Sequence, residues 1–210
     1  MTTKELSQLS ALHYLVDKHG KQEAFGKINK KLEKSNSDYK LEKLKRGIAV
    51  FKDKEGNAVM NLKGTDIKNH KDIMSDIKLG LGLSKYDKQF QSRAKQIDNY
   101  LNNQQKGSVI LTGHSLGSSI ITQHLAKSPS TLSKIKSAEL FNTGYTMPFH
   151  NSLSPSIDKE HRKNLKKKIT HHHIKGDLIS NQLNEKAIGD VIVYETDKGN
   201  KHSLSHFSEI

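Results

Sequence analysis

The feature that most constrains this chain is a glycine-flanked turn between an apolar run and a helical segment. The run is Ser108–Thr112, the turn is Gly113-His114-Ser115-Leu116-Gly117, and residues 118–127 repeat apolar side chains at helical spacing. A strand that turns tightly into a helix is the building unit of an open α/β sheet. The chain has 210 residues, which is long enough for one domain of this class with a buried core.

The glycines of this turn predict an exposed serine. Side chains at positions 113 and 117 would collide with the strand and the helix, and glycine removes the β-carbon at both contacts. Ser115 would then stand at the carboxyl edge of the sheet, with the N-terminus of the next helix directed at it. The pattern is typical of a serine nucleophile, and an ordinary strand–helix turn that happens to hold serine is the alternative.

The rest of the chain alternates between helical and extended patterns. Helices are predicted over residues 4–19, from there to about 34, over 86–103 and over 158–167, with Gly20 as a stop and a loop at 35–38. Strands are predicted over 47–51, 58–62, 138–141, 169–174 and 191–194. We therefore expect a single α/β domain over 1–210, with a mostly parallel sheet flanked by helices. Residues 1–38 would be a helical N-terminal extension packed on it.

Three segments carry a family resemblance. Leu111-Thr112-Gly113-His114-Ser115-Leu116-Gly117 resembles the class 3 lipase family, the fungal triacylglycerol lipase type of α/β hydrolase. Leu62-Lys63-Gly64-Thr65-Asp66 is similar to the family's Arg-Gly-Thr motif, with lysine in place of arginine. Phe141-Asn142-Thr143-Gly144 is similar to its Phe-Asn-Pro-Gly motif, with threonine in place of proline. The resemblance covers roughly residues 47–207 and implies an α/β-hydrolase fold.

The resemblance also implies a triad in the order serine, acid, histidine. Lys175–Ser180 resembles the family's Gly-Asp-Pro-Val-Ser segment, with Leu178 in place of proline, and this assigns the acid to Asp177. His202 fits the family's His-Ser-Leu-x-x-Phe pattern and would be the base. His206 is the alternative base and would otherwise be a surface or packing residue. The acid would hold the imidazole in the correct tautomer and stabilise its charged form.

Two donors are expected to form the oxyanion hole. The turn supplies the backbone N–H of Leu116, and the resemblance assigns the second donor to Thr65. In the family, a helix after this threonine acts as a lid over the serine. Residues 67–83 carry apolar side chains, and Gly80 and Gly82 are candidate hinges. A fixed packing helix is the alternative to a lid.

Three consecutive histidines, His171-His172-His173, raise the question of a metal site. Alternate residues of a strand face opposite sides, so only His171 and His173 share a face. No carboxylate cluster has clear ligand spacing beside them. We expect neither a metal nor a cofactor, and we expect His114, at the variable position of the turn, to be structural.

The charge balance bears on partners. Lysine and arginine number 35 against 22 acidic residues, a net charge of +13. Such a surplus favours anionic partners, namely nucleic acid, anionic lipid surfaces or acidic polymers, and biased composition with solvated lysines is the alternative. Of these partners we expect an anionic membrane surface and no nucleic acid. The absence of cysteine excludes disulfides and thiol catalysis.

No segment resembles a secretory signal or reaches the ~18 apolar residues of a membrane span. We expect a soluble protein that is cytoplasmic or, by analogy with lysine- and asparagine-rich lipase-like domains of DNA viruses, associated with a virion.

These features predict a serine carboxylic ester hydrolase that acts on lipid acyl esters through Ser115, Asp177 and His202. Triacylglycerol, phospholipid acyl esters and small soluble esters all suit such machinery. The rival hypothesis is a catalytically inactive, basic membrane- or nucleic-acid-binding protein on a hydrolase scaffold, because a fold does not fix a function.

Overall fold

The computed structural model describes residues 1–45, 47–64, 83–144, 157–177, 180, 187–197 and 199–209. Several predicted features lie outside these residues, namely Thr65, the candidate lid over 67–82 with its two glycines, and Leu178.

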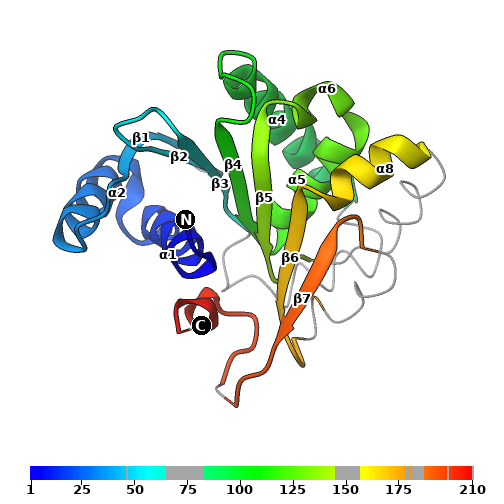
Figure 1. Cartoon of the computed structure of the whole chain (residues 1–210). Coiled ribbons are helices and arrows are strands. Elements are labelled where there is room, and N and C mark those ends of the chain that lie inside the picture. The colour runs from blue at the N-terminus through cyan, green and yellow to red at the C-terminus, as the bar shows by residue number, and fades with distance from the viewer. Residues whose placement is uncertain are drawn as a thin grey trace.

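Seven strands of the described residues form one sheet in sequence order. They are β1 (Lys40–Lys45), β2 (Ile48–Lys52), β3 (Ala58–Leu62), β4 (Val109–His114), β5 (Ile135–Phe141), β6 (Ile169–Ile174) and β7 (Asp190–Tyr194). β1, β2 and β3 are antiparallel neighbours, and each later strand is parallel to the one before it. The carboxyl ends of β3 to β7 therefore share one edge (Figure 1). The predicted fold class, a mostly parallel α/β sheet of the α/β-hydrolase type, is confirmed.

The central strands are buried on both faces. Every residue of β3 is buried, and so is all of β4 except Ile110, which is half-buried. Parallel strands that are covered on both faces have nearly continuous apolar sequences. These two strands can therefore be predicted from sequence. β7, at the end of the sheet, leaves Ile192 and Val193 exposed.

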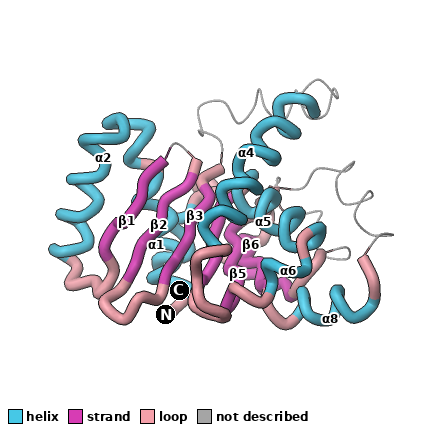
Figure 2. Tube along the Cα trace, turned by 90° about the horizontal axis from the view of Figure 1, so that it is seen from above, coloured by secondary structure: helices cyan, strands magenta, loops and turns pink. Residues whose placement is uncertain are grey.

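Helices cover both faces of the sheet, which gives three layers (Figures 1 and 2). On one face lie α4 (Leu83–Leu101), α5 (Leu116–Lys127), α6 (Pro129–Leu132) and α8 (Lys159–Lys166). On the other lie α1 (Thr3–His13), α2 (Leu15–Lys34) and the 3₁₀ helix η2 (Leu204–Ser208). Both chain ends therefore pack on the same face, where Leu9 and Phe207 join one apolar cluster with Phe51.

None of the helices formed by the described residues is both long enough and apolar enough to cross a bilayer.

The first helix ends earlier than predicted. α1 stops at His13 instead of continuing to residue 19, and Tyr14 is the junction with α2. The apolar spacing runs on across this junction, so the sequence pattern does not show the break. Gly20 interrupts α2 with φ 71° and ψ 171°, a conformation that glycine adopts without steric cost.

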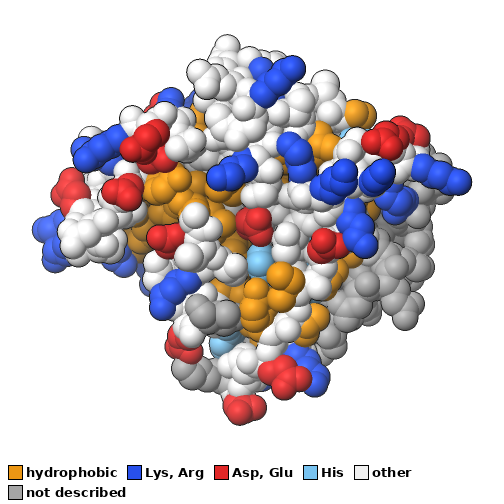
Figure 3. Space-filling view, in the orientation of Figure 1, with side chains coloured by type: hydrophobic (Ala, Val, Ile, Leu, Met, Phe, Trp, Pro, Cys, Tyr) orange, Lys and Arg blue, Asp and Glu red, His pale blue; other side chains and the backbone are white. Residues whose placement is uncertain are grey.

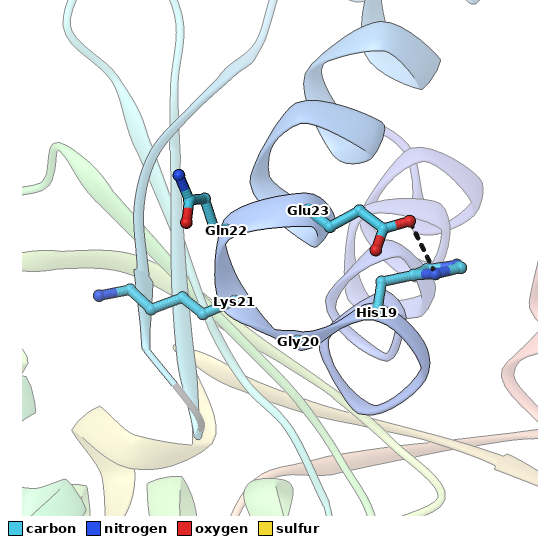
Figure 4. Close-up of a pocket in the computed structure, with 5 residues that line it drawn as sticks. All are labelled: His19, Gly20, Lys21, Gln22 and Glu23. Carbon is cyan, nitrogen blue, oxygen red and sulfur yellow. Dashed lines mark ion pairs between the residues drawn. The ribbon is translucent and has the colours of Figure 1, made fainter.

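A pocket lies at the kink at Gly20 (Figure 4). Its lining runs from His19 to Glu23, and these two side chains form an ion pair of 3.3 Å. All the residues that line it belong to α2, so the pocket is separate from the turn at Ser115.

Candidate active site

Ser115 sits in a strained turn between β4 and α5. β4 ends at His114, α5 begins at Leu116, and Ser115 adopts φ 55° and ψ −122°. A positive φ is uncommon outside glycine and costs about 1–3 kcal/mol, so it persists only where the surrounding structure imposes it. The predicted sharp turn at this serine is therefore present.

The flanking glycines allow the turn to pack. A β-carbon on Gly113 would lie 2.8 Å from the backbone nitrogen of Ser118. A β-carbon on Gly117 would overlap the carbonyl group of Leu62 on β3. The collisions are with the helix and with the neighbouring strand, which is the physical reason that the sequence pattern requires glycine at both positions.

The end of β5 holds the turn in place. The backbone N–H of Ser115 donates to the carbonyl of Phe141 at 3.0 Å, and the N–H of Gly144 donates to the carbonyl of Ser115 at 3.2 Å. Phe141-Asn142-Thr143-Gly144 thus packs directly against the serine. Ser115 itself is buried, with 3% of its surface exposed, so the prediction of an exposed serine is wrong.

Asn142 joins three parts of the site. It is fully buried and has φ 41°. Its side-chain N–H donates to the carbonyl of Lys201 at 3.1 Å, and its side-chain oxygen accepts the N–H of Ile174 at 3.1 Å. One amide therefore connects the ends of β5 and β6 with the segment that carries His202. The motif indicated this residue, but sequence alone gave it no role.

Asp177 and His202 form a buried pair. Asp177 follows β6, and its Oδ2 lies 2.8 Å from Nδ1 of His202. The hydroxyl of Ser180 donates to the same carboxylate oxygen at 2.7 Å. The two residues are 25 positions apart in sequence, so the fold brings them together, and their roles as acid and base stay a prediction.

The tautomer of His202 follows from this partner. A carboxylate only accepts hydrogen bonds, so Nδ1 carries a proton, and in the neutral ring Nε2 then keeps its lone pair. That is the tautomer a general base needs. The contact between Nε2 and the hydroxyl of Ser115 stays a prediction.

His114 connects the serine turn to His202. Its Nε2 lies 2.8 Å from the backbone carbonyl of His202, and the two rings are 4.8 Å apart. Its Nδ1 lies 2.7 Å from the hydroxyl of Tyr14. These contacts agree with the structural role expected for His114, and they place His202 against the residue that precedes Ser115. Tyr14 was not predicted as a site residue, because its position in a helical pattern carries no signal for such a contact.

The contacts of His206 are those of a packing residue, which was the alternative to its being the base. His206 belongs to η2, where its side chain is buried, and its Nε2 lies 2.7 Å from the carbonyl of Asn200. The side-chain oxygen of Asn200 in turn accepts the backbone N–H of His202 at 3.1 Å. His206 therefore supports the loop that carries His202.

One of the two predicted oxyanion donors, Leu116, lies within the described residues. Leu116 is the first residue of α5, so its N–H is one of the four that have no acceptor within the helix. A β-carbon on Gly144 would lie 3.6 Å from this nitrogen, so the Phe141–Gly144 segment borders it. Thr65 lies outside the described residues, and its role stays a prediction.

The three histidines of β6 are buried in separate contacts. His171 lies 2.8 Å from the hydroxyl of Thr143 and 3.1 Å from the carbonyl of Ile188. Burial lowers the pKa of His173 to about 4, and the nearby carboxylate of Asp177 only partly offsets this effect. Within the described part of the chain, no group of three or more histidine, aspartate or glutamate side chains is arranged to hold a metal.

Comparison with known proteins adds little to this geometry. No protein-family model matches the chain, and no curated protein matches it. Among solved structures it is similar to one described as YahD with malic acid, with a TM-score of 0.40 and 11% identity over 60% of this chain. The match covers 62% of that chain, so it spans less than two thirds of its length. At this distance the match does not bear on the site, and the fold assignment rests on the sheet and the turn at Ser115.

Proposed function

We propose that this chain is a serine carboxylic ester hydrolase of the class 3 lipase type, acting on lipid acyl esters through Ser115, Asp177 and His202. The observation that carries the proposal is the buried hydrogen bond between Asp177 and His202, beside the strained turn at Ser115. Backbone strain at a non-glycine residue is costly and clusters at functional sites. A buried histidine–carboxylate pair beside such a turn supports nucleophilic catalysis.

In the proposed reaction, the Ser115 hydroxyl oxygen attacks the ester carbonyl carbon while Nε2 of His202 takes its proton. The N–H groups of Leu116 and Thr65 stabilise the oxyanion, each by roughly 3 kcal/mol. Collapse of the intermediate breaks the ester C–O bond, and His202 returns the proton to the leaving alkoxide. Water then attacks the acyl-enzyme in the same way and releases the carboxylic acid. Asp177 stabilises the imidazolium throughout.

The choice of lipid acyl esters rests on the family resemblance. Both triacylglycerol and phospholipid fit it. The net charge of +13 favours a phospholipid at an anionic surface, since each basic group near such a surface adds about 1 kcal/mol of binding.

A covalent probe and an ester assay test the proposal together. The wild-type protein should react with a fluorophosphonate and hydrolyse p-nitrophenyl butyrate and phospholipid vesicles, while Ser115→Ala should do neither and keep its far-UV circular dichroism. Only an activated serine reacts with the probe. A fully active Ser115→Ala protein would contradict the proposed mechanism. A wild-type protein that is inert in both assays would favour a non-catalytic scaffold.

His206 offers a matched control for the base. His202→Ala should lower kcat by several orders of magnitude and His206→Ala by little. Members of a triad act as a unit, so adding His202→Ala to Ser115→Ala should cost little more. If His206→Ala is the inactive variant, the base is misassigned.

A further inference from the structure

The hydroxyl of Tyr14 lies where three parts of the candidate site meet. Tyr14 is the junction residue between α1 and α2, far from the site in sequence. Its oxygen is 2.7 Å from Nδ1 of His114, and it accepts the backbone N–H of Gly64 at 3.2 Å. His114 precedes the proposed nucleophile, and Gly64 precedes the predicted oxyanion donor Thr65. One hydroxyl therefore contacts both sides of the proposed reaction centre.

The direction of these hydrogen bonds is fixed by their partners. The carbonyl of His202 can only accept, so Nε2 of His114 carries the proton that binds it. In the neutral ring Nδ1 is then an acceptor, and the Tyr14 hydroxyl must donate to it. The tyrosine oxygen in turn accepts from Gly64. A continuous chain of donors therefore runs from the end of β3, through Tyr14 and His114, to the backbone of His202.

The packing at Gly64 shows how closely these groups approach. A β-carbon on Gly64 would lie 3.0 Å from the Tyr14 oxygen, 3.0 Å from Cβ of Ser115 and 2.7 Å from the carbonyl oxygen of His114. Each distance is shorter than ordinary van der Waals contact. Only a residue without a β-carbon therefore fits between the Tyr14 hydroxyl and the serine turn, and the hydrogen bonds of that hydroxyl to Gly64 and His114 link the end of β3 to the turn.

A second contact holds the same end of β3. Lys63 is buried, its ammonium forms an ion pair with Asp17 of α2, and it lies 5.3 Å from the centre of the Tyr14 ring. The carbonyl of Lys63 accepts a hydrogen bond from the Arg93 guanidinium of α4 at 2.6 Å. The N-terminal helices thus hold both residues that lead into position 65.

We propose that Tyr14 is a positioning residue of the active site, which makes the N-terminal helices part of the catalytic machinery. This inference rests on the proposed function. The Tyr14 hydroxyl would set the distance between the oxyanion-hole side at β3 and the nucleophile and base at β4 and His202. Displacement of reacting groups by about 1 Å can lower a rate roughly 100-fold, so the loss of this single hydroxyl should lower kcat.

The test compares two tyrosine hydroxyls that make the same kind of bond. Tyr14→Phe keeps the ring and removes the contact with His114. Tyr194→Phe removes an equivalent contact of 2.9 Å with Nδ1 of His172, on β7. With p-nitrophenyl butyrate, Tyr14→Phe should lower kcat about tenfold or more and leave KM within about twofold, because positioning acts on the reacting groups. Tyr194→Phe should keep kcat.

A spectroscopic measurement follows the hydrogen bond itself. In ¹⁵N spectra of the histidine rings, wild-type His114 should be the Nε2–H tautomer, and its Nδ1 resonance should shift in Tyr14→Phe, where the donor is lost. Thermal unfolding of both variants separates positioning from stability. Should Tyr14→Phe not fold, His114→Leu breaks the same contact from the other side.

The outcomes separate this inference from the proposed function. An active wild type whose kcat is unchanged by Tyr14→Phe overturns the role of Tyr14 and leaves the hydrolase proposal standing. Equal kcat losses in the two variants, each matched by lower thermal stability, also overturn it. A wild type without esterase activity overturns the function and the positioning role together, and the ¹⁵N spectra then report only on the folded structure.

Discussion

His13 is a buried histidine between two acceptors. Its Nδ1 lies 2.7 Å from the side-chain oxygen of Asn61, and its Nε2 lies 3.3 Å from the carbonyl of Lys45. These contacts favour the protonated ring. Burial disfavours it more strongly, with help from the charges of Lys63 and Arg93, and lowers the pKa to about 4. The folded protein therefore keeps this ring neutral under conditions where the unfolded chain protonates it.

This difference predicts acid sensitivity. Above pH ~6.5, the usual histidine pKa, both states are neutral and the stabilisation is fully present. As the pH falls from ~6.5 towards 4, the unfolded state binds the proton first, and stability decreases by up to ~1.4 kcal/mol per pH unit for this group. The neutral mimic His13→Gln should lose about 2–3 kcal/mol less than the wild type between pH 7 and 4.5, measured by urea unfolding. Equal losses in the two proteins would contradict the assignment.

The site residues divide into those that a local pattern can predict and those that it cannot. Ser115, Asp177 and His202 each sit in a short motif, and the pair that the described structure can test, Asp177 with His202, is hydrogen-bonded. Tyr14 and Asn142 act through contacts with residues distant in the chain; Tyr14 and His114, for example, are 100 positions apart. Nothing in the sequence around either residue encodes its partner, so only the fold reveals their roles.

At the scale of elements, α2 is tied to the end of β3 by one buried ion pair. The Lys63 side chain is 6% exposed and that of Asp17 is 21% exposed. Asp17→Asn would leave the lysine ammonium buried without its counter-charge. Because breaking one partner of a buried pair strands a charge, we expect a loss of about 3 kcal/mol in the free energy of unfolding, measured with urea.

The exposed pair between Lys175 and Glu195 is the control for this prediction. Its atoms are 2.6 Å apart, but both side chains are mostly exposed, at 68% and 75%. Solvent screens such a pair, so Glu195→Gln should cause no measurable loss. If Asp17→Asn is as harmless as Glu195→Gln, α2 is not held to β3 by this ion pair.

Elements with regular patterns could be predicted, and irregular ones could not. β3 has the bounds that its apolar run predicted, residues 58–62. β1 was missed because its two buried leucines, Leu41 and Leu44, are three positions apart and do not follow the alternation of a strand. A register shift between Leu41 and Lys43 accounts for this spacing, since a bulge puts an extra residue into one strand.

At the scale of the whole molecule, one cluster of basic side chains lies at the edge of the sheet opposite the proposed site. Lysine and arginine side chains gather over α8 and the adjoining surface (Figure 3). α8 leads into the amino end of β6, and Lys159, Lys163 and Lys166 are exposed on it. Ser115 and Asp177 follow the carboxyl ends of β4 and β6. Six residues of strand separate the two edges by about 20 Å, which exceeds the Debye length of about 8 Å at physiological ionic strength.

The net positive charge predicts how the hydrolysis of lipid vesicles depends on lipid charge and salt. If the net charge of +13 draws the enzyme to lipid, phosphatidylglycerol vesicles should be hydrolysed faster than phosphatidylcholine vesicles, and high salt should erase the difference. Turnover of a short-chain soluble ester should depend little on salt, because it needs no surface. Equal turnover on both vesicles, indifferent to salt, would mean that the positive charge is compositional bias and that the protein is a general esterase.

A variant with glutamine at Lys159, Lys163 and Lys166 locates the surface that matters. Because these lysines lie at the edge opposite Ser115, beyond the screening distance, their loss should leave the preference for anionic vesicles largely intact. If the preference disappears, α8 is the membrane-facing element. The serine edge would then face away from the lipid during binding, and hydrolysis would require the protein to release and turn before each attack. Binding and turnover must therefore be measured on the same vesicles, so that the contribution of α8 to binding is separated from its contribution to hydrolysis.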